Sequence, residues 1–306
     1  MIRPVVIVFC AVALAAGTTA PVARIELGRR LFYDKRMSGN GSQSCASCHR
    51  QELAFTDGRA VSIGATGQAH TRSAMSLVNV AQASVLTWND PAMRSLEKQA
   101  LVPMLGAHPV ELGVDQPALL RLLRSEPVYR DLFPKAFPQV ADPFRIANVA
   151  RALAAFERTI VSRRSAYDRY HYDGDTGAIS EAARRGEVLF FTDGLGGCFR
   201  CHAGANFTDG EFHNTALAAD QTTRFKTPTL RNVELTAPYM HDGSIATLEA
   251  VIEHYASGGR EHGNPHRDDR MKLLPLTPQN RADLVEFLKS LTDREVIRDP
   301  KFSDPW

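Results

Sequence analysis

The apolar positions of this 306-residue chain recur at the spacing of helices rather than of strands. Residues 145–166 are predicted to be helical because five apolar side chains follow one another by three or four positions: Ile146, Val149, Leu153, Phe156 and Ile160. Thr277 and Pro278 are typical of a helix start and predict a helix to about Leu291. Its buried side is expected to carry Leu284, Val285, Phe287 and Leu288. Period-2 alternation is scarce, so we predict an all-α fold with long loops and little sheet.

Two amphipathic segments of similar pattern, residues 26–32 and 185–191, each precede a pair of cysteines. This similarity indicates an internal repeat, in which each segment forms a helix that packs on whatever group its cysteines bind. A polar stretch at 165–179 separates the two halves. We therefore predict an N-terminal domain of residues 21–166 and a C-terminal domain of residues 167–306.

The first twenty residues have the pattern of a secretory signal peptide: Arg3, an apolar run over 5–16, and small residues to position 20. The apolar run is too short to span a membrane. Pro21 disfavours a cut after Ala20, so the cleavage site stays open. We expect export to the periplasm, with no integral membrane segment left after removal of 1–20. The balance of 36 basic and 34 acidic residues gives no sign of a nucleic-acid partner.

The chain contains the pattern Cys-x-x-Cys-His twice, as Cys45, Cys48, His49 and as Cys198, Cys201, His202. Each copy is typical of the attachment of a c-type haem, because two thiols one helical turn apart reach two vinyl groups and the histidine faces the iron. A zinc knuckle would need further ligands at finger-like spacing, and a redox dithiol would follow a strand in a βαβ unit. The fifth cysteine, Cys10, is expected to leave with the signal peptide. Two covalently bound haems are predicted.

Two long motifs then point to a family. Phe-Lys-Thr-Pro-Thr-Leu-Arg-Asn-Val at 225–233 and Thr-Ala-Pro-Tyr-Met-His-Asp-Gly at 236–243, with residues 206–210 and 213–214, closely resemble the MauG and bacterial di-haem cytochrome c peroxidase superfamily. The resemblance covers nearly all of the mature chain. It implies two cytochrome c-like domains, the first with a haem that reacts with hydrogen peroxide and the second with a six-coordinate haem.

The distal ligand of the second haem separates the branches of this superfamily, and here Tyr255 stands at its position, fourteen residues after His241. Peroxidases that take electrons from small redox proteins have a methionine there, whereas MauG-like enzymes have a tyrosine. Met240 and His254 are rival ligands. A hard oxygen ligand favours highly oxidised iron, so the resemblance implies that peroxide produces iron(IV) on both haems, which then oxidise a partner protein by long-range electron transfer.

The resemblance also assigns residues to the pocket in which the first haem would react with peroxide. Trp88 would relay electrons between the haems, and Gln99, Pro103 and Glu111 would line the open iron position, with Glu111 as general acid and base. The loop 103–111 is two residues longer than in MauG, so His108 is a second candidate for this role.

The resemblance also implies one calcium ion between the domains, bound by Asn79 and the carbonyls of Thr236 and Pro238. In the peroxidase branch a loop histidine closes the first iron until reduction, and His70 lies near that place. We favour an open site because Tyr255 is typical of the MauG-like branch.

Residues 86–91, 100–104 and 108–113 look most like the MbnH branch of MauG relatives. Enzymes of that branch are associated with a copper-binding partner, MbnP, in which a tryptophan becomes kynurenine. The leading hypothesis is therefore a peroxide-dependent oxidase of a partner protein. The alternatives are a di-haem peroxidase fed by a small redox protein and a non-catalytic di-haem electron carrier.

Overall fold

A computed structural model of the chain describes residues 19–218, 221–259 and 264–306, so the predicted signal peptide lies almost entirely outside the described residues. The helices are α1 (Ala20–Tyr33), α2 (Cys45–Cys48), α3 (Leu96–Leu105), α4 (Gln116–Ser125), α5 (Pro127–Ala136), α6 (Ile146–Glu157), α7 (Ala166–Tyr172), α8 (Glu181–Phe191), α9 (Leu248–Ala256) and α10 (Pro278–Ser290). The described strands, β1 (Phe212–His213) and β2 (Phe225–Lys226), pair antiparallel. The predicted all-α class with little sheet is confirmed.

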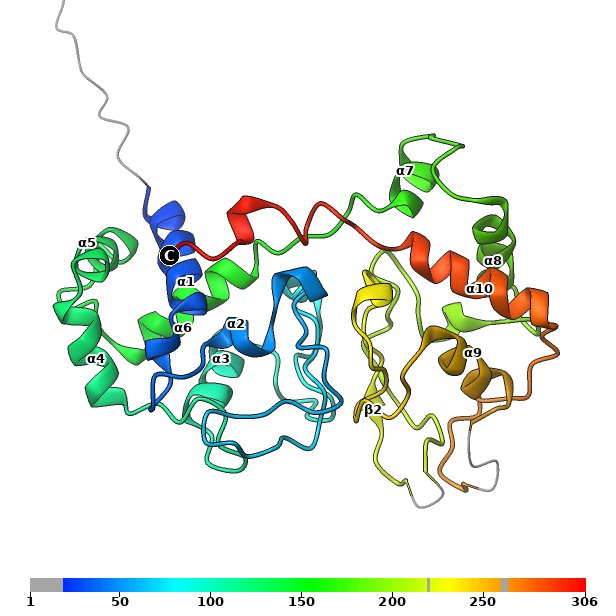
Figure 1. Cartoon of the computed structure of the whole chain (residues 1–306), viewed down its shortest axis with the longest axis horizontal. Helices are drawn as coiled ribbons and strands as arrows, with labels where there is room; N and C mark the ends of the chain where they lie inside the picture. The colour runs from blue at the N-terminus through cyan, green and yellow to red at the C-terminus, as the bar shows by residue number, and fades with distance from the viewer. Residues whose placement is uncertain (1–18, 219–220, 260–263) are drawn as a thin grey trace, which may run out of the picture.

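The chain forms two hydrophobic cores that lie side by side (Figure 1). The first gathers side chains of α1 and α3–α6 around Phe32 and Phe156, and the second gathers side chains of α7–α10 around Phe190 and Phe287. After α10 the chain runs back to the first core, where Val296 and Phe302 are buried. The division at 166/167 stays a prediction, and these last residues pack with the first half of the chain.

Each core contains the same kind of close helix crossing, which supports the predicted internal repeat. In the first, a Cβ on Gly28 of α1 would lie 1.9 Å from the Ala152 carbonyl oxygen of α6. In the second, a Cβ on Gly186 of α8 would lie 2.0 Å from the Asp283 carbonyl oxygen of α10. Only glycine allows such an approach. Both predicted segments before the cysteine motifs are thus helical, inside α1 and α8.

The helix predicted within 145–166 ends earlier, at Glu157, so this prediction was wrong at its C-terminal end. The backbone of the following segment has partners outside any helix: Ser162 N–H donates to Asn79 Oδ1, and the N–H groups of Arg163 and Arg164 donate to Asp293 Oδ2. Ile160 is still fully buried, which is why its spacing looked helical.

The C-terminal helix is confirmed as α10, with Thr277 accepting a hydrogen bond from Asn280 N–H at its start. All four of its predicted core residues are buried: Leu284, Val285, Phe287 and Leu288. Within the part of the chain that the structure describes, no helix is long and apolar enough to cross a membrane.

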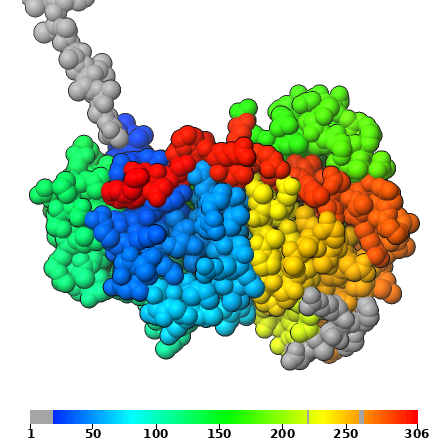
Figure 2. Space-filling view, in the orientation of Figure 1, coloured from blue at the N-terminus to red at the C-terminus, as the bar shows by residue number. Residues whose placement is uncertain are grey.

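The two halves meet along a continuous face, visible where the blue and yellow surfaces touch in Figure 2. Ser73 of the first half donates its N–H to the His241 carbonyl at 2.9 Å and its hydroxyl to the Met240 carbonyl at 3.1 Å. A Cβ on Gly243 would lie 2.3 Å from Ala60 Cα, so the contact at this point is backbone against backbone. This interface positions the site.

Candidate functional site

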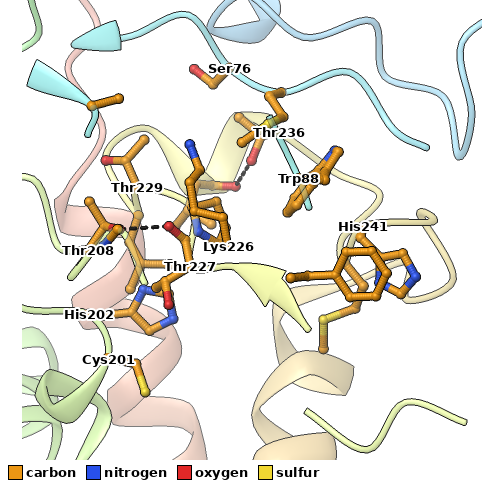
Figure 3. A pocket seen from close by; sticks show the side chains of 18 of the residues that line it. Ser76, Trp88, Cys201, His202, Thr208, Lys226, Thr227, Thr229, Thr236 and His241 are labelled. Carbon is orange, nitrogen blue, oxygen red and sulfur yellow. Dashed lines mark hydrogen bonds between the residues drawn. The ribbon is translucent and has the colours of Figure 1, made fainter. Parts of the chain in front are cut away.

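A cavity of about 990 Å³ lies between the halves and is lined by both Cys-x-x-Cys-His motifs (Figure 3). It collects every predicted site residue except Cys45, from both halves: Cys48, His49, Asn79, Trp88, Gln99, Pro103, Glu111, Cys198, Cys201, His202, Thr236, Pro238 and Tyr255. Cys45 lines a smaller cavity of about 50 Å³ that shares Cys48 and His49 with the large one.

The two motif histidines are held in the same way. His49 Nδ1 lies 2.9 Å from the Phe55 carbonyl oxygen, and His202 Nδ1 lies 3.0 Å from the Phe207 carbonyl oxygen. Both phenylalanines have positive φ, 62° and 51°, which turns each carbonyl toward its ring. A carbonyl can only accept, so each Nδ1 carries the proton and each Nε2 keeps its lone pair. Burial lowers the pKa of both histidines, which favours this neutral form.

This arrangement fits two haems. All four cysteines in the described chain are free of disulfides, and each pair stands beside a histidine whose Nε2 is available to iron. The carbonyl contacts supply the outer hydrogen bonds that orient metal-bound imidazoles.

Tyr255 lies on α9, and the helix begins where predicted, with Thr247 accepting from Ala250 N–H. The pKa of the Tyr255 phenol is raised. Burial is the largest cause, and the electrostatic effects of Cys201 and Cys198 add to it. A phenolate at this position therefore needs a cation beside it. Of the rival ligands, Met240 lines the cavity, whereas His254 Nε2 lies 3.0 Å from the Thr215 carbonyl. Tyr255 and Met240 therefore remain the candidates whose side chains border the cavity.

Trp88 is fixed between the halves and stands above β2 in Figure 3. Its Nε1–H donates to the Ser73 carbonyl at 2.9 Å, and its own carbonyl accepts from Lys226 N–H at 2.8 Å. The buried Lys226 ammonium donates to the Val85 carbonyl at 2.8 Å, and burial lowers its pKa to about 8. Sequence reasoning missed Lys226, whose role depends on contacts 138 to 141 residues away in the chain.

The predicted peroxide pocket is assembled on α3 and the loop after it. Gln99 and Pro103 are one turn apart and line both cavities together with Glu111. Burial raises the pKa of Glu111. His70 lines the same cavities with its Nε2 3.9 Å from Glu111 Oε1, whereas His108 lies outside the residues that line either cavity.

Asn79, Thr236 and Pro238 also border the large cavity. Asn79 Oδ1 accepts from Ser162 N–H at 2.9 Å, which uses one of its two lone pairs. Its Nδ2 donates to the Ser162 carbonyl and to Asn206 Oδ1. Within the described residues, no backbone N–H donates to the Thr236 or Pro238 carbonyl. The donor set, all neutral oxygen, fits calcium.

Two further groups were missed by sequence reasoning. Glu157, at the end of α6, lines the smaller cavity, and its buried Oε2 has no hydrogen-bond partner. His213 lies between Asp209 and Asp268, at 2.9 and 2.7 Å. Their ligand atoms group with the sulfur of Cys201, which is a predicted haem-attachment cysteine, so we assign no separate metal site to them.

Comparison with known proteins agrees with this geometry. The model of the family described as di-haem cytochrome c peroxidase matches residues 22–177, and the cytochrome c model matches residues 183–292. The chain belongs to the di-haem cytochrome c peroxidase family. It is therefore an oxidoreductase with two c-type haems, one in each of two cytochrome c-like domains.

The family includes proteins of two kinds that resemble this chain. The methylamine utilization protein MauG of Methylophilus methylotrophus is 36% identical over 282 residues, covering 88% of this chain and 82% of that protein. The cytochrome c551 peroxidase of Nitrosomonas europaea is 34% identical over 288 residues, covering 87% and 79%. A crystal structure of a MauG-like protein associated with microbial copper homeostasis superposes with a TM-score of 0.88 at 40% identity, over 93% of each chain.

Proposed function

We propose that this protein is a periplasmic enzyme that uses hydrogen peroxide to oxidise a residue of a partner protein by long-range electron transfer. The residue is a tryptophan, converted to kynurenine, and the partner is a copper-binding protein like MbnP. The likeness to the MauG-like protein associated with copper homeostasis supports this choice. So do the sequence runs at 86–91 and 108–113, which resemble the MbnH branch.

The observation that carries the proposal is the position of Tyr255. This phenol borders the cavity that the second haem motif lines, on a helix whose start is fixed by the Thr247 cap. A phenolate is a hard anionic ligand and stabilises iron in high oxidation states better than a thioether does. With the motif histidines and Tyr255 as iron ligands, two bound haems would supply the redox chemistry with hydrogen peroxide, with iron(IV) on both as the oxidised state.

The side chains of the first half act on peroxide. Glu111 accepts the first peroxide proton and returns it to the departing oxygen. Burial raises the pKa of Glu111, which makes its carboxylate a stronger base than an exposed one. Pro103 offers no ligand atom and would leave the position at an iron open, while Gln99, one turn earlier, supplies an amide to orient peroxide.

Trp88 carries electrons between the two haem sites. Trp88 lines the cavity that both motifs border, its indole N–H donates to the Ser73 carbonyl, and its backbone carbonyl accepts from Lys226 N–H. Fixing the ring keeps its distances to both groups constant. Lys226 of the second half also holds the segment before Trp88, because its ammonium donates to the Val85 carbonyl.

Calcium would sit between the halves, bound by Asn79 Oδ1 and the Thr236 and Pro238 carbonyls, with water completing its shell. It would join Asn79 of the first half to a loop of the second.

A second candidate function is a peroxidase that detoxifies hydrogen peroxide with electrons from a small redox protein. The likeness to the cytochrome c551 peroxidase and the presence of Met240 at the cavity favour it. A non-catalytic carrier would require both irons to be six-coordinate and inert to peroxide.

Tyr255→Phe tests the proposal. It removes only the ligand oxygen, and the optical and magnetic spectra of the second haem should change, with loss of the two-haem oxidised state. Tyr239→Phe is the matched control, because Tyr239 borders the same cavity but donates its hydroxyl to the Val233 carbonyl. Unchanged spectra in Tyr255→Phe would favour methionine ligation and the peroxidase function.

A further inference from the structure

A chain of contacts joins the second motif histidine to the protein surface, through the Phe207 backbone carbonyl and then through aromatic rings. His202 Nδ1 contacts the Phe207 carbonyl at 3.0 Å, and the Phe207 ring meets Tyr167 edge to face at 5.4 Å. Tyr167 stacks on His171 at 5.2 Å with an interplanar angle of 14°, and His171 meets Tyr172 at 4.8 Å. Each link is a hydrogen bond or a ring contact.

The two tyrosines of this path differ sharply in exposure. Tyr167 is 3% exposed and belongs to the second core, whereas Tyr172 is 61% exposed. Both lie on α7, five residues apart, so one short helix joins the core to the surface. A phenol exposed this far can be touched by another protein.

The buried phenol has a proton acceptor. Burial raises the pKa of Glu187, against the opposing effects of the His171 charge and a hydrogen bond from Tyr167. His171 Nδ1 lies 3.7 Å from Glu187 Oε1. The carboxylate of Glu187 can therefore take the Tyr167 proton when that ring loses an electron.

The helix that carries the path is held firmly. Ser165 and Asp168 form a capping box at its start, and Asp168 accepts two hydrogen bonds from Arg231 at 2.8 and 2.9 Å. The Arg231 guanidinium also lies over the Phe207 ring, 5.7 Å from its centroid. One buried ion pair thus locks α7 against the residue that contacts the haem histidine.

We propose that Tyr172, His171 and Tyr167 form an electron relay, through which a partner protein docked at Tyr172 reduces the second haem. The inference rests on the proposed function, which supplies peroxide as the oxidant. It places the docking surface for the partner at Tyr172, where electrons from the partner would enter this protein.

The steps balance as follows. Tyr167 gives one electron toward His202 and its phenolic proton to Glu187, which leaves a tyrosyl radical. Tyr172 refills this radical with one electron through the stacked His171, while Glu187 returns the phenolic proton to Tyr167, and Tyr172 loses its own proton to water. An electron and a proton from the partner then restore Tyr172. Two passages consume the two oxidising equivalents of one hydrogen peroxide.

Trapping the radical tests the relay without a partner. The purified di-haem protein is treated with one equivalent of hydrogen peroxide and a nitroso spin trap, and the adduct is located by peptide mass spectrometry. We expect an adduct on Tyr172, its loss in Tyr167→Phe, and its retention in Tyr170→Phe. Tyr170 is the matched control because it lies on the same helix but contacts Arg184 instead of the stack.

A second variant leaves the hydrophobic core unaltered. Tyr172→Phe alters only an exposed hydroxyl, and here the tyrosyl signal in electron paramagnetic resonance should persist longer, since Tyr167 has lost its donor. An adduct on Tyr172 that survives Tyr167→Phe would overturn the relay. So would an unlabelled Tyr172 in a sample whose haem spectrum responds to peroxide, and that result leaves the proposed function standing. Haem spectra that do not respond overturn both.

Discussion

His70 Nε2 lies 3.9 Å from Glu111 Oε1 at the edge of the cavity that Gln99 and Pro103 line. His70 Nδ1 accepts the Arg72 N–H at 3.0 Å, so the proton of the neutral imidazole is on Nε2. Burial and the Arg72 charge lower the pKa of His70 and keep the ring neutral. Glu111 thus has a neutral imidazole as its neighbour, 3.9 Å away and beyond hydrogen-bond distance.

Glu111→Gln should slow the reaction of the ferric protein with peroxide by about 10²–10⁴-fold, because it removes the base. In the unaltered protein, burial raises the pKa of Glu111, so the base form is lost at a higher pH than for an ordinary carboxyl group. The rate should fall as pH drops through that raised value, and stopped-flow spectra across pH measure it. Glu52→Gln, at an exposed glutamate paired with Arg50, is the control. A rate that is equal in both variants contradicts the assignment.

His70→Ala should leave the spin state of the resting ferric protein unchanged, because the proposal leaves the first iron open and His70 Nδ1 already accepts the Arg72 N–H. Low-temperature electron paramagnetic resonance reads this directly. Conversion of a low-spin haem to high spin in the variant would mean that His70 ligates the first iron and closes the site at rest.

Removal of calcium should weaken the contact between the halves. A chelator, or Asn79→Ala, is expected to lower the melting temperature, and added calcium should restore it only in the unaltered protein. Asn206→Ala separates ligation from packing, since Asn206 bonds Asn79 Nδ2 and not its oxygen. Metal analysis that finds no calcium in the purified protein would reject the site.

Glu157 should make stability depend on pH. Burial raises its pKa from 4.5 to about 7, so the folded state binds this proton more tightly than the unfolded state does. Its contribution to stability is complete below about pH 4.5 and is lost as pH rises toward 7. Glu157→Gln should therefore stabilise the protein at pH 8, by up to about 3 kcal/mol, and much less at pH 5. Equal melting shifts at the two pH values would show that the carboxyl group is not protonated in the fold.

Local pattern predicted the parts of the site that a short segment fixes by itself. The haem motifs, the Thr247 cap and the inward face of α9 with Tyr255 depend on spacing within one turn or two. The family resemblance then named Trp88 and Glu111, which no local pattern distinguishes from core or surface residues.

Long-range contacts decided what the sequence could not predict. Residues 158–165 leave the helix because Asn79 and Asp293 bind their backbone. The local sequence around Lys226 gives no sign that this lysine is buried. In the fold it is buried, and its ammonium donates to the Val85 carbonyl of the first half. The relay depends on a fold that stacks His171 on Tyr167, four residues away, and sets Phe207 against them.

The most direct test of the central claim is to add one equivalent of hydrogen peroxide to the diferric protein and record its Mössbauer spectrum. We predict that both haem irons become iron(IV), without a porphyrin radical in the optical spectrum. A ferric pair that stays inert until one haem is reduced would contradict the proposal and make this protein a peroxidase fed by a small redox protein.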